Sequence, residues 1–322
     1  MRLKSVLLVL GTLACLPPAA SADDFPNKAI RLIVPTGPGG AADFVSRLVA
    51  EKLQVSLGQP TVVEDRPGAN GIVGATYVLG APADGYTMMM GHIGLMTINS
   101  HIYKQMKFDP LTDFVPVTRA VTYSNVLLVN NKLPIHSVAD LIKYAKDKPG
   151  ALTYSSSGFG ASFHMAFEML KVQAGIEAVH IPYTGTAQAL TAVVAGNVDV
   201  GFIDLITAAP QIEAKTVRAI AVSGTTRSKM LPDIPTVAET GLPGFDVVGW
   251  NGIVVKAGTP PERIALLNEH IARALASPDV AKRISEQGAE VAAGTPEEFG
   301  AFMRAEDNKW ADLARKAKLE AN

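Results

Sequence analysis

Two short turns rich in glycine and hydroxyl side chains hold the residues best suited to bind a small molecule. The first turn, residues 35–40, follows the strand-like run 30–34, and the second turn, residues 155–162, follows the strand-like run 152–154. Each turn lacks bulky side chains near the backbone and leads into a helical pattern, whose first N–H groups and dipole favour a negative charge. If the turns face each other across a cleft, they suit a carboxylate-bearing ligand.

Neither turn contains a positively charged side chain. No Lys or Arg occurs between Arg31 and Arg47, or between Lys148 and Lys171. Binding would therefore depend on backbone amides, Ser and Thr hydroxyls and water rather than on an ion pair. The alternative is that both are ordinary strand-to-helix turns, in which Gly and Ser only permit tight geometry.

The motifs of common enzyme classes are absent from the sequence. Gly158-Phe159-Gly160 lacks the third glycine of the dinucleotide fingerprint, and no phosphate loop, G-x-S-x-G elbow or H-E-x-x-H pattern occurs. No two histidines stand at i, i+4 as metal ligands often do. His164, just inside the second helix start, either contacts a ligand or holds the turn by a hydrogen bond. We therefore expect a protein that is not an enzyme and uses neither cofactor nor metal.

The first 22 residues have the pattern of an export signal. Arg2 and Lys4 precede the apolar run 6–16, which is shorter than the roughly 20 residues that span a bilayer. An A-x-A pattern ends at Ala22, so residues 1–22 are predicted to be a secretory signal peptide that is cleaved after Ala22 on the way to a periplasm. The alternative is a lipoprotein acylated at Cys15.

Composition excludes several classes of protein. Of the 322 residues, 48% are hydrophobic and 18% are charged, a balance that excludes a disordered chain. The formal net charge is -1 and no basic run follows the signal, so nucleic acid is not an expected partner. A single cysteine allows no intrachain disulfide and no cysteine-based metal cluster.

Alternating strand and helix patterns must position the two turns. Helical periodicity is clearest at residues 41–57, and Ser137 and Thr295 open capping boxes for later helices. The alternation predicts an α/β fold with mainly parallel strands. Further strand-like runs occupy residues 61–64, 86–90, 126–129, 198–202 and 217–222.

Two proline-rich stretches, residues 108–116 and 231–244, bracket a central block of domain size and are expected to be connections. If the block forms one lobe and the flanking parts form the other, the chain crosses between lobes twice, as in a hinged protein. One glycine-rich turn then falls in each lobe.

A series of short motifs runs along the chain in a specific order and spacing. They include FPNKAIRLIVP at 25–35, EDRPG at 64–68, ADGYT at 83–87, HIPY at 180–183 and LPDIPT at 231–236. On these motifs the chain resembles the Bug-type periplasmic solute receptors, the extracytoplasmic binding proteins of tripartite tricarboxylate transport systems.

The resemblance implies an α/β, two-lobed periplasmic binding protein of type II, the Venus-flytrap topology, in which each lobe is a mixed sheet flanked by helices. It implies lobe 1 at residues 23–121 plus 247–322 and lobe 2 at residues 122–246. The family holds a small acid between the lobes, with a carboxyl group against the two turns, partly through ordered waters.

The resemblance also assigns residues of this chain to the ligand site. Lobe 1 is expected to contribute Thr36, Gly37, Pro38, Gly39, Gly40 and Asp43, with His92 as a further candidate. Lobe 2 is expected to contribute Ser156, Ser157, Gly158, Gly160, Ser162 and His164, with Tyr183, Thr184, Thr186 and Asp204 towards the distal end.

Two departures from the family pattern bear on the ligand. Family members usually carry an aromatic residue at the place of Thr36 and often a Lys at that of Thr184. Without this Lys, a neutral or aromatic distal group is more plausible than a second carboxylate. Asp204 either pairs with a ligand amine or caps its own loop.

The expected function is capture of a small carboxylic acid by a monomeric receptor that delivers it to the membrane subunits of a tripartite tricarboxylate-type transporter. Mono- and dicarboxylates, aromatic acids and amino acids are the ligand classes in question. The alternative is a periplasmic sensor or co-receptor that presents the bound solute to a signalling system. An enzyme is the least expected class, because the turns lack a nucleophile paired with a base.

Overall fold

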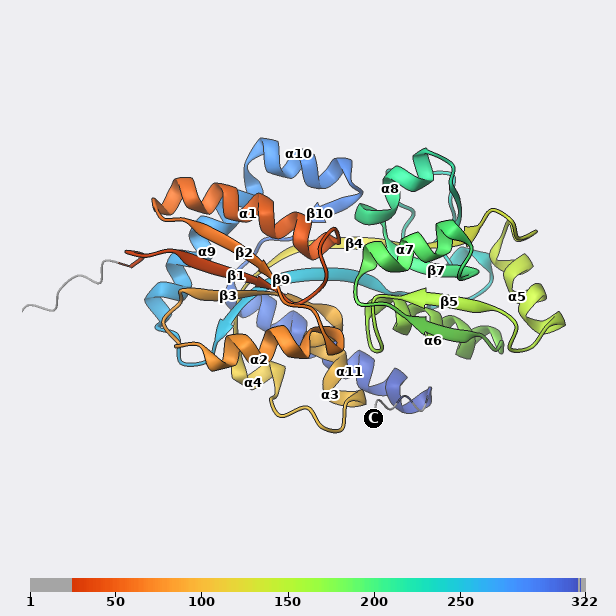
Figure 1. Ribbon diagram of the computed structural model, residues 1–322, viewed down its shortest axis with the longest axis horizontal. Coiled ribbons are helices and arrows are strands. Elements are labelled where there is room, and N and C mark those ends of the chain that lie inside the picture. Colours follow the sequence, from red (N-terminus) through yellow and green to blue (C-terminus); the bar gives the residue numbers. More distant parts are fainter. Residues whose placement is uncertain (1–24, 318, 320–322) are drawn as a thin grey trace, which may run out of the picture.

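The computed structural model describes residues 25–317 and residue 319, which form an α/β fold on one curled sheet (Figure 1). The strands are β1 (Ile30–Val34), β2 (Thr61–Asp65), β3 (Thr87–His92), β4 (Phe114–Asn130), β5 (Thr153–Ser156), β6 (Val179–Pro182), β7 (Val200–Asp204), β8 (Val217–Val222), β9 (Val248–Lys256) and β10 (Ala289–Val291). The α-helices are α1 (Ala41–Leu57), α2 (Ile72–Gly80), α3 (Asn99–Ile102), α4 (Pro110–Asp113), α5 (Val138–Asp147), α6 (Ser162–Ala174), α7 (Thr186–Ala195), α8 (Leu205–Glu213), α9 (Pro261–Ala276), α10 (Pro278–Glu286) and α11 (Pro296–Lys316). Helical turns of other types are η1 (Ala69–Gly71), η2 (Gly94–Ile98) and η3 (Ala238–Thr240).

A single long strand joins the two parts of the sheet. Strand β4 pairs with β9 and β10 through its first part and with β7 and β8 through its last part. Lobe 1 is the part with the order β2-β1-β3-β9-β4, and lobe 2 is the part with the order β4-β7-β5-β6. The lobes lie along the long axis of the molecule, and β4 and β9 run between them (Figure 1). The residue boundaries at 122 and 247 stay a prediction.

Strand directions are mixed in both lobes, as the family resemblance implied. The pairs β1·β2, β1·β3, β5·β6 and β5·β7 are parallel, whereas β4 and β9 are antiparallel to their partners. The mainly parallel sheet expected from strand–helix alternation is therefore wrong at β4 and β9. Strand β4 passes from lobe 1 into lobe 2, and β9 follows the return of the chain to lobe 1. Neither belongs to a strand–helix–strand unit, which is the unit that enforces parallel pairing.

Helices cover both faces of the sheet in lobe 1. Alternate residues of a strand point to opposite faces, and β1 divides accordingly. Leu32 and Val34 pack in the cluster formed with α1 and α9, whereas Ile33 packs with α2 and η2. Figure 1 shows α1 and α10 on one side of the sheet and α2 and α4 on the other.

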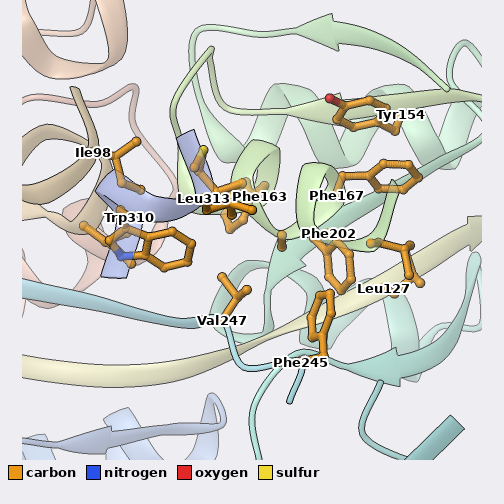
Figure 2. Packing of buried hydrophobic residues seen from close by; sticks show 14 of the residues in the cluster. Ile98, Leu127, Tyr154, Phe163, Phe167, Phe202, Phe245, Val247, Trp310 and Leu313 are labelled. Carbon is orange, nitrogen blue, oxygen red and sulfur yellow. The ribbon is translucent and has the colours of Figure 1, made fainter. Parts of the chain in front are cut away.

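One apolar core continues from lobe 1 into lobe 2. Helix α11 brings Trp310 and Leu313 into the same buried cluster as Phe163 of α6 (Figure 2). Deeper in lobe 2, Phe202 and Phe245 stack with ring centroids 5.9 Å apart. Because a fully buried large side chain contributes about 1.5–3 kcal/mol, this shared core ties α11 to both lobes near the connecting strands.

Local signals located several helices correctly. Helix α1 occupies the predicted residues 41–57, and the Thr295–Glu298 capping box at α11 is confirmed, with both reciprocal hydrogen bonds present. At α5, Ser137 Oγ accepts from the Asp140 amide at 3.1 Å, although the Asp140 carboxylate returns to His136 rather than to Ser137.

The stretch 108–116, expected to be a connection, already contains a strand. Strand β4 begins at Phe114, and Pro116 lies opposite Val254 of β9. Pairing shifts register directly after Pro116, which fits a residue that cannot donate to the ladder. The proline therefore marks an irregular strand and not its absence.

The predicted signal peptide, residues 1–22, lies outside the described residues, as does Cys15. Within the described part of the chain, no helix is both long enough and apolar enough to cross a membrane.

Candidate functional site

The first turn is held in shape by the helix that follows it. It passes through Gly39, whose φ of 79° is a conformation that glycine adopts readily. The Gly39 amide donates to Asp43 Oδ2 at 3.0 Å, and Asp43 forms a 2.7 Å ion pair with Arg47. Asp43 thus braces the turn. Helix α1 begins at Ala41 without a side-chain cap, so its first N–H groups remain available to a bound group.

The second turn also uses its own residues to fix its path. Gly158 and Gly160 have φ of 134° and 80°. The Gly158 amide donates to Ser156 Oγ at 3.1 Å, and the Gly160 amide donates to His164 Nδ1 at 3.1 Å. Of the two roles expected for His164, the hydrogen bond that holds the turn is present. Helix α6, like α1, begins without a side-chain cap.

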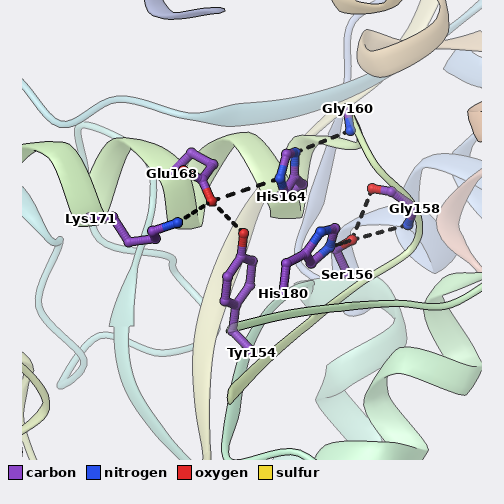
Figure 3. A network of polar contacts seen from close by, with 8 residues as sticks. All are labelled: Tyr154, Ser156, Gly158, Gly160, His164, Glu168, Lys171 and His180. Carbon is purple, nitrogen blue, oxygen red and sulfur yellow. Dashed lines mark hydrogen bonds and ion pairs between the residues drawn. The ribbon is translucent and has the colours of Figure 1, made fainter. Parts of the chain in front are cut away.

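A buried polar network lies behind the second turn (Figure 3). Glu168 Oε1 accepts hydrogen bonds from the Tyr154 hydroxyl at 2.6 Å and from Lys171 Nζ at 2.7 Å. The same oxygen lies 3.8 Å from His164 Nε2. The network therefore holds the His164 ring on the side that faces away from Gly160, and so fixes the position of the first turn of α6.

Two neutral histidines stack within this network. The rings of His164 and His180 are 4.3 Å apart, and His180 Nε2 lies 2.6 Å from Ser156 Oγ. Burial lowers the pKa of each histidine to about 3, so both are uncharged at pH 7. Because His164 Nδ1 accepts a hydrogen bond from Gly160, its proton is carried on Nε2, towards Glu168.

The first turn lies directly against the start of α7 in lobe 2. A Cβ atom on Gly185 would stand 3.3 Å from the Cα of Gly37, and a Cβ on Gly40 would stand 3.3 Å from Oγ1 of Thr186. Glycines therefore permit the lobes to approach this closely. Helix α7 is a third helix that begins without a side-chain cap.

A second contact between the lobes involves α3, η1 and the second turn. The Tyr103 hydroxyl donates to the Phe159 carbonyl at 2.9 Å. Asn70 donates to Asn99 at 2.8 Å, and both side chains lie against Gly160. The lobes thus touch on two sides of the space between them.

Two small cavities lie between these contacts and share Thr36 and Ser157 in their linings. The inner cavity has a volume of about 30 Å³ and is lined by the starts of α1, α6 and α7 together with His92 and Asp204. The outer cavity has a volume of about 130 Å³ and is lined by η1, the second turn, Tyr103 and Tyr183. The inner cavity holds about one water or the tip of a carboxyl group, and the outer one has room for a small organic molecule.

The inner cavity is electrostatically suited to an anion. The starts of α1, α6 and α7 all reach it, and each has unsatisfied N–H groups and the positive end of a helix dipole. No Lys or Arg is among the described residues that line either cavity. Oriented amides and hydroxyls must therefore stabilise a negative charge here.

Asp204 and His92 are two of the groups in the inner cavity whose pKa values are strongly shifted. Burial raises the pKa of the Asp204 carboxyl to about 6, although hydrogen bonds from Thr207 and Thr186 oppose the shift. Burial lowers the pKa of His92 to about 4, so His92 is neutral at pH 7. Its Nδ1 accepts from the Leu95 amide at 3.4 Å, which leaves the proton on Nε2.

Two buried polar atoms of the inner cavity residues have no hydrogen-bond partner among the described residues. They are His92 Nε2, a donor, and Asn251 Oδ1, an acceptor. Buried polar groups are paired in most proteins. These two atoms are therefore free to bond to a ligand or to a water beside it.

The structure brings part of the predicted site together around the cavities and puts the rest behind them. The predicted residues that line a cavity are Thr36, Gly40, His92, Ser157, Gly158, Ser162, Tyr183, Thr184, Thr186 and Asp204. The others belong to the turns and to the supports behind them, and are Gly37, Pro38, Gly39, Asp43, Ser156, Gly160 and His164.

Sequence reasoning missed four polar side chains at this site: Asn70, Tyr103, Tyr123 and Asn251. Asn70 had a visible signal, because the Asn70-Gly71 pair forms a turn after β2, at the same strand ends as the first turn. Tyr123 and Asn251 lie within long strands, where no local pattern distinguishes a residue that faces a cavity.

A larger groove lies elsewhere, between α10, β10 and the loop after β8. Its volume is about 810 Å³. Its charged residues already pair with each other or with neighbours, since Arg227 bonds to Glu239 and Lys229 to Glu290. It lacks the converging helix starts of the inner cavity, so we place the candidate site at the two smaller cavities. The described residues contain no group of three or more His, Cys, Asp or Glu side chains that could hold a metal ion.

The fold and the site together define a two-lobed solute-binding protein. A model of the family described as "Tripartite tricarboxylate transporter family receptor" matches residues 45–319, and the chain belongs to this family of receptors. The resemblance to Bug-type receptors is thereby confirmed, and the family is one of binding proteins rather than enzymes.

Solved structures agree over the whole described fold. Rpa4515 of R. palustris, determined with adipate, is 36% identical, with 92% of this chain and 99% of that chain covered and a TM-score of 0.89. The periplasmic binding protein BugD is 32% identical, with 92% and 100% covered and a TM-score of 0.88. MatC of Rhodopseudomonas palustris, with bound malate, is 30% identical, with 90% and 99% covered and a TM-score of 0.86.

Proposed function

We propose that this protein captures a small carboxylic acid between its lobes and delivers it to the membrane subunits of a tripartite tricarboxylate-type transporter. The observation that carries the proposal is the convergence of three uncapped helix starts on one cavity that is lined mostly by buried residues, with no Lys or Arg among the described residues of its lining. Such a cavity favours an anion through fixed N–H groups. Membership of the transporter receptor family supports delivery to membrane partners.

The ligand is proposed to be a compact acid with one carboxyl group at the inner cavity and its remainder in the outer cavity. Related structures contain adipate or malate, which supports acids of this size. The outer lining of Tyr103, Phe159 and Tyr183 suits an uncharged or aromatic remainder, since its described residues offer no cation for a second carboxylate. The predicted residues that line the two cavities are proposed to contact the ligand.

Lobe closure is proposed to turn on the two segments in which the chain passes between the lobes. The chain enters lobe 2 within β4 and returns to lobe 1 before β9, which supports boundaries near residues 122 and 247. We also propose that residues 1–22 are removed during export to the periplasm, as suits a member of a periplasmic receptor family.

A thermal-shift screen tests the proposed ligand class. The panel contains adipate, malate, benzoate, glutamate and hexanoate, with hexanamide as an uncharged control. Because a ligand that binds only the folded state stabilises it, at least one acid is expected to raise the melting temperature, and the amide is not. Absence of a shift with every acid, or an equal shift with the amide, would contradict the proposal.

A further inference from the structure

The carboxyl group of Asp204 is buried beside the place proposed for the ligand's own carboxyl group. Asp204 ends β7, is 1% exposed and lines the inner cavity. Its Oδ1 accepts from the Thr207 amide at 2.8 Å, so Asp204 caps α8. Of the two roles expected for Asp204, the cap is therefore present, and it fixes the carboxyl group in the cavity wall.

Among the described residues, no element packed around Asp204 presents a positive charge to it. Strand β4 contributes Tyr123, whose pKa is raised by burial, and β3 contributes His92, which is neutral at pH 7. Strand β9 contributes the amide Asn251, and α6 and α7 contribute hydroxyls. The Asp204 carboxyl, whose own pKa is raised to about 6, thus has hydrogen-bond donors but no counter-ion.

We propose that capture of a carboxylate takes up one proton, which Asp204 and the ligand's carboxyl group share in a hydrogen bond, direct or through one water. This inference rests on the proposed function, because it requires an acid between the lobes. Two carboxylates in one buried site without a cation do not both stay ionised, since each raises the pKa of the other. The proton passes from solvent to a carboxyl oxygen on binding and returns to solvent on release.

The unpartnered atoms of the cavity support a shared proton. His92 Nε2 offers a donor and Asn251 Oδ1 lacks one. The imidazole N–H can donate to a carboxyl oxygen of the pair, and a bridging water can donate to Asn251 Oδ1 and to a carboxyl oxygen. Both unpartnered atoms thus find partners when a carboxyl group lies beside Asp204.

Calorimetric titration with adipate tests the inference, with malate as the probe if adipate gives no heat. Phosphate and Tris have different ionisation enthalpies. The difference between the binding enthalpies measured in these two buffers at pH 8 therefore gives the number of protons taken up. We expect close to one proton per acid at pH 8 and close to none at pH 5. The apparent dissociation constant is expected to rise about tenfold between pH 7 and pH 8.

Asp204→Asn tests the proton uptake of Asp204 separately from its role as the cap of α8. Asn caps helices about as well as Asp, and its amide donates a hydrogen bond at every pH. A carboxyl group with a pKa of about 6 is roughly 1% protonated at pH 8. The variant is therefore expected to take up no proton and to bind the acid about 100-fold more tightly than the natural protein at pH 8. Asp109→Asn is the matched control, because Asp109 caps α4 through the Leu111 amide at 2.8 Å but is exposed and lines neither cavity. It is expected to keep the natural proton uptake.

Three outcomes would overturn the inference. Binding of adipate or malate without proton uptake at pH 8 would contradict the shared proton, but it would leave the proposed function intact. Weaker binding by Asp204→Asn at pH 8 would show that an ionised Asp204 is needed, as for a ligand ammonium group. Failure of every acid to bind would contradict the proposed function as well.

Discussion

Single side chains at the site differ in whether the fold has already given them a partner. Asp43, Ser156 and His164 bond to the backbone of their own turns. His92 and Asn251, in contrast, each keep a buried polar atom without a partner among the described residues. A buried polar group without a hydrogen-bond partner lowers the stability of the folded state by about 1–3 kcal/mol. The first set therefore builds the site, and the second set is ready to bond to what enters it.

At the residue scale, His92→Leu is expected to weaken binding of an acid about 10- to 100-fold. The change removes a neutral N–H donor, and a hydrogen bond to a charged group contributes about 1.5–3 kcal/mol. In the unliganded protein the variant removes the unpaired Nε2 donor but also the Nδ1 acceptor of the Leu95 amide. These two effects on stability oppose each other, so the melting temperature should change little. Titration calorimetry and thermal melting of the same samples measure the two effects.

His101→Leu is the control for this substitution. His101 lies in lobe 1 and pairs with Asp307 at 2.8 Å, and it lines neither cavity. Its replacement should leave acid affinity unchanged. Equal affinity of His92→Leu and the natural protein would show that His92 does not contact the bound acid.

At the scale of elements, the helix starts are useful only if the lobes come close together. The first turn touches the start of α7 through glycine backbones, and the second turn touches α3 and η1. Gly185 is the informative position, because its φ of -168° is ordinary extended backbone that any residue adopts. A side chain there would obstruct the contact without straining the turn itself.

Gly185→Val is expected to lower acid affinity at least tenfold, which is about 1.4 kcal/mol. Its Cβ would stand 3.3 Å from the Gly37 Cα, closer than most such contacts, and the valine methyl groups would hold the lobes apart. Small-angle scattering should show less compaction on ligand binding. Gly80→Val is the control, because a Cβ on Gly80 meets nothing within 4 Å. Unchanged affinity of Gly185→Val would show that close approach at this point is not needed.

At the scale of the whole molecule, buried neutral histidines link stability to pH. Burial lowers the pKa of His92 to about 4 and those of His164 and His180 to about 3. The unfolded chain therefore binds more protons than the folded one between about pH 4 and pH 6.5, and stability falls as the pH falls through this window. Asp204 acts in the opposite direction, because its raised pKa stabilises the folded state as the pH falls from about 6 to 4. The loss of stability from three histidines is larger than the gain from one carboxyl group, so the folded state becomes less stable as the pH falls.

The melting temperature of the unliganded protein is expected to be roughly 10 °C or more lower at pH 4.5 than at pH 7. Each group with a shifted pKa changes stability by about 1.4 kcal/mol per pH unit, and about 1 kcal/mol shifts the melting temperature of a protein of this size by roughly 2–4 °C. His180→Gln should reduce the slope and His136→Gln, at an exposed position, should not. A melting temperature that is flat or rises towards pH 4.5 would contradict the assignment of these histidines as neutral and buried.

Much of the fold and part of the site could be predicted from local sequence. Residues 41–57 form α1 as the periodicity predicted, and Thr295 caps α11. Both glycine-rich turns join a strand to an uncapped helix start, as their composition indicated. Helix periodicity, caps and turns depend on residues close together in the chain, so a sequence displays them directly.

The tertiary structure alone decided which of these residues face the cavity. The sequence by itself determined two strand-to-helix turns without a cation. An anion held at these turns would therefore have to bond to amides and hydroxyls. It could not reveal that His164 would brace Gly160 from behind, or that Tyr123 and Asn251 would reach the cavity from the connecting strands. These roles depend on contacts between residues distant in sequence, and on how closely two glycine backbones of different lobes approach. The same burial sets the pKa of Asp204, because a carboxyl group loses its hydration only when several distant elements close around it.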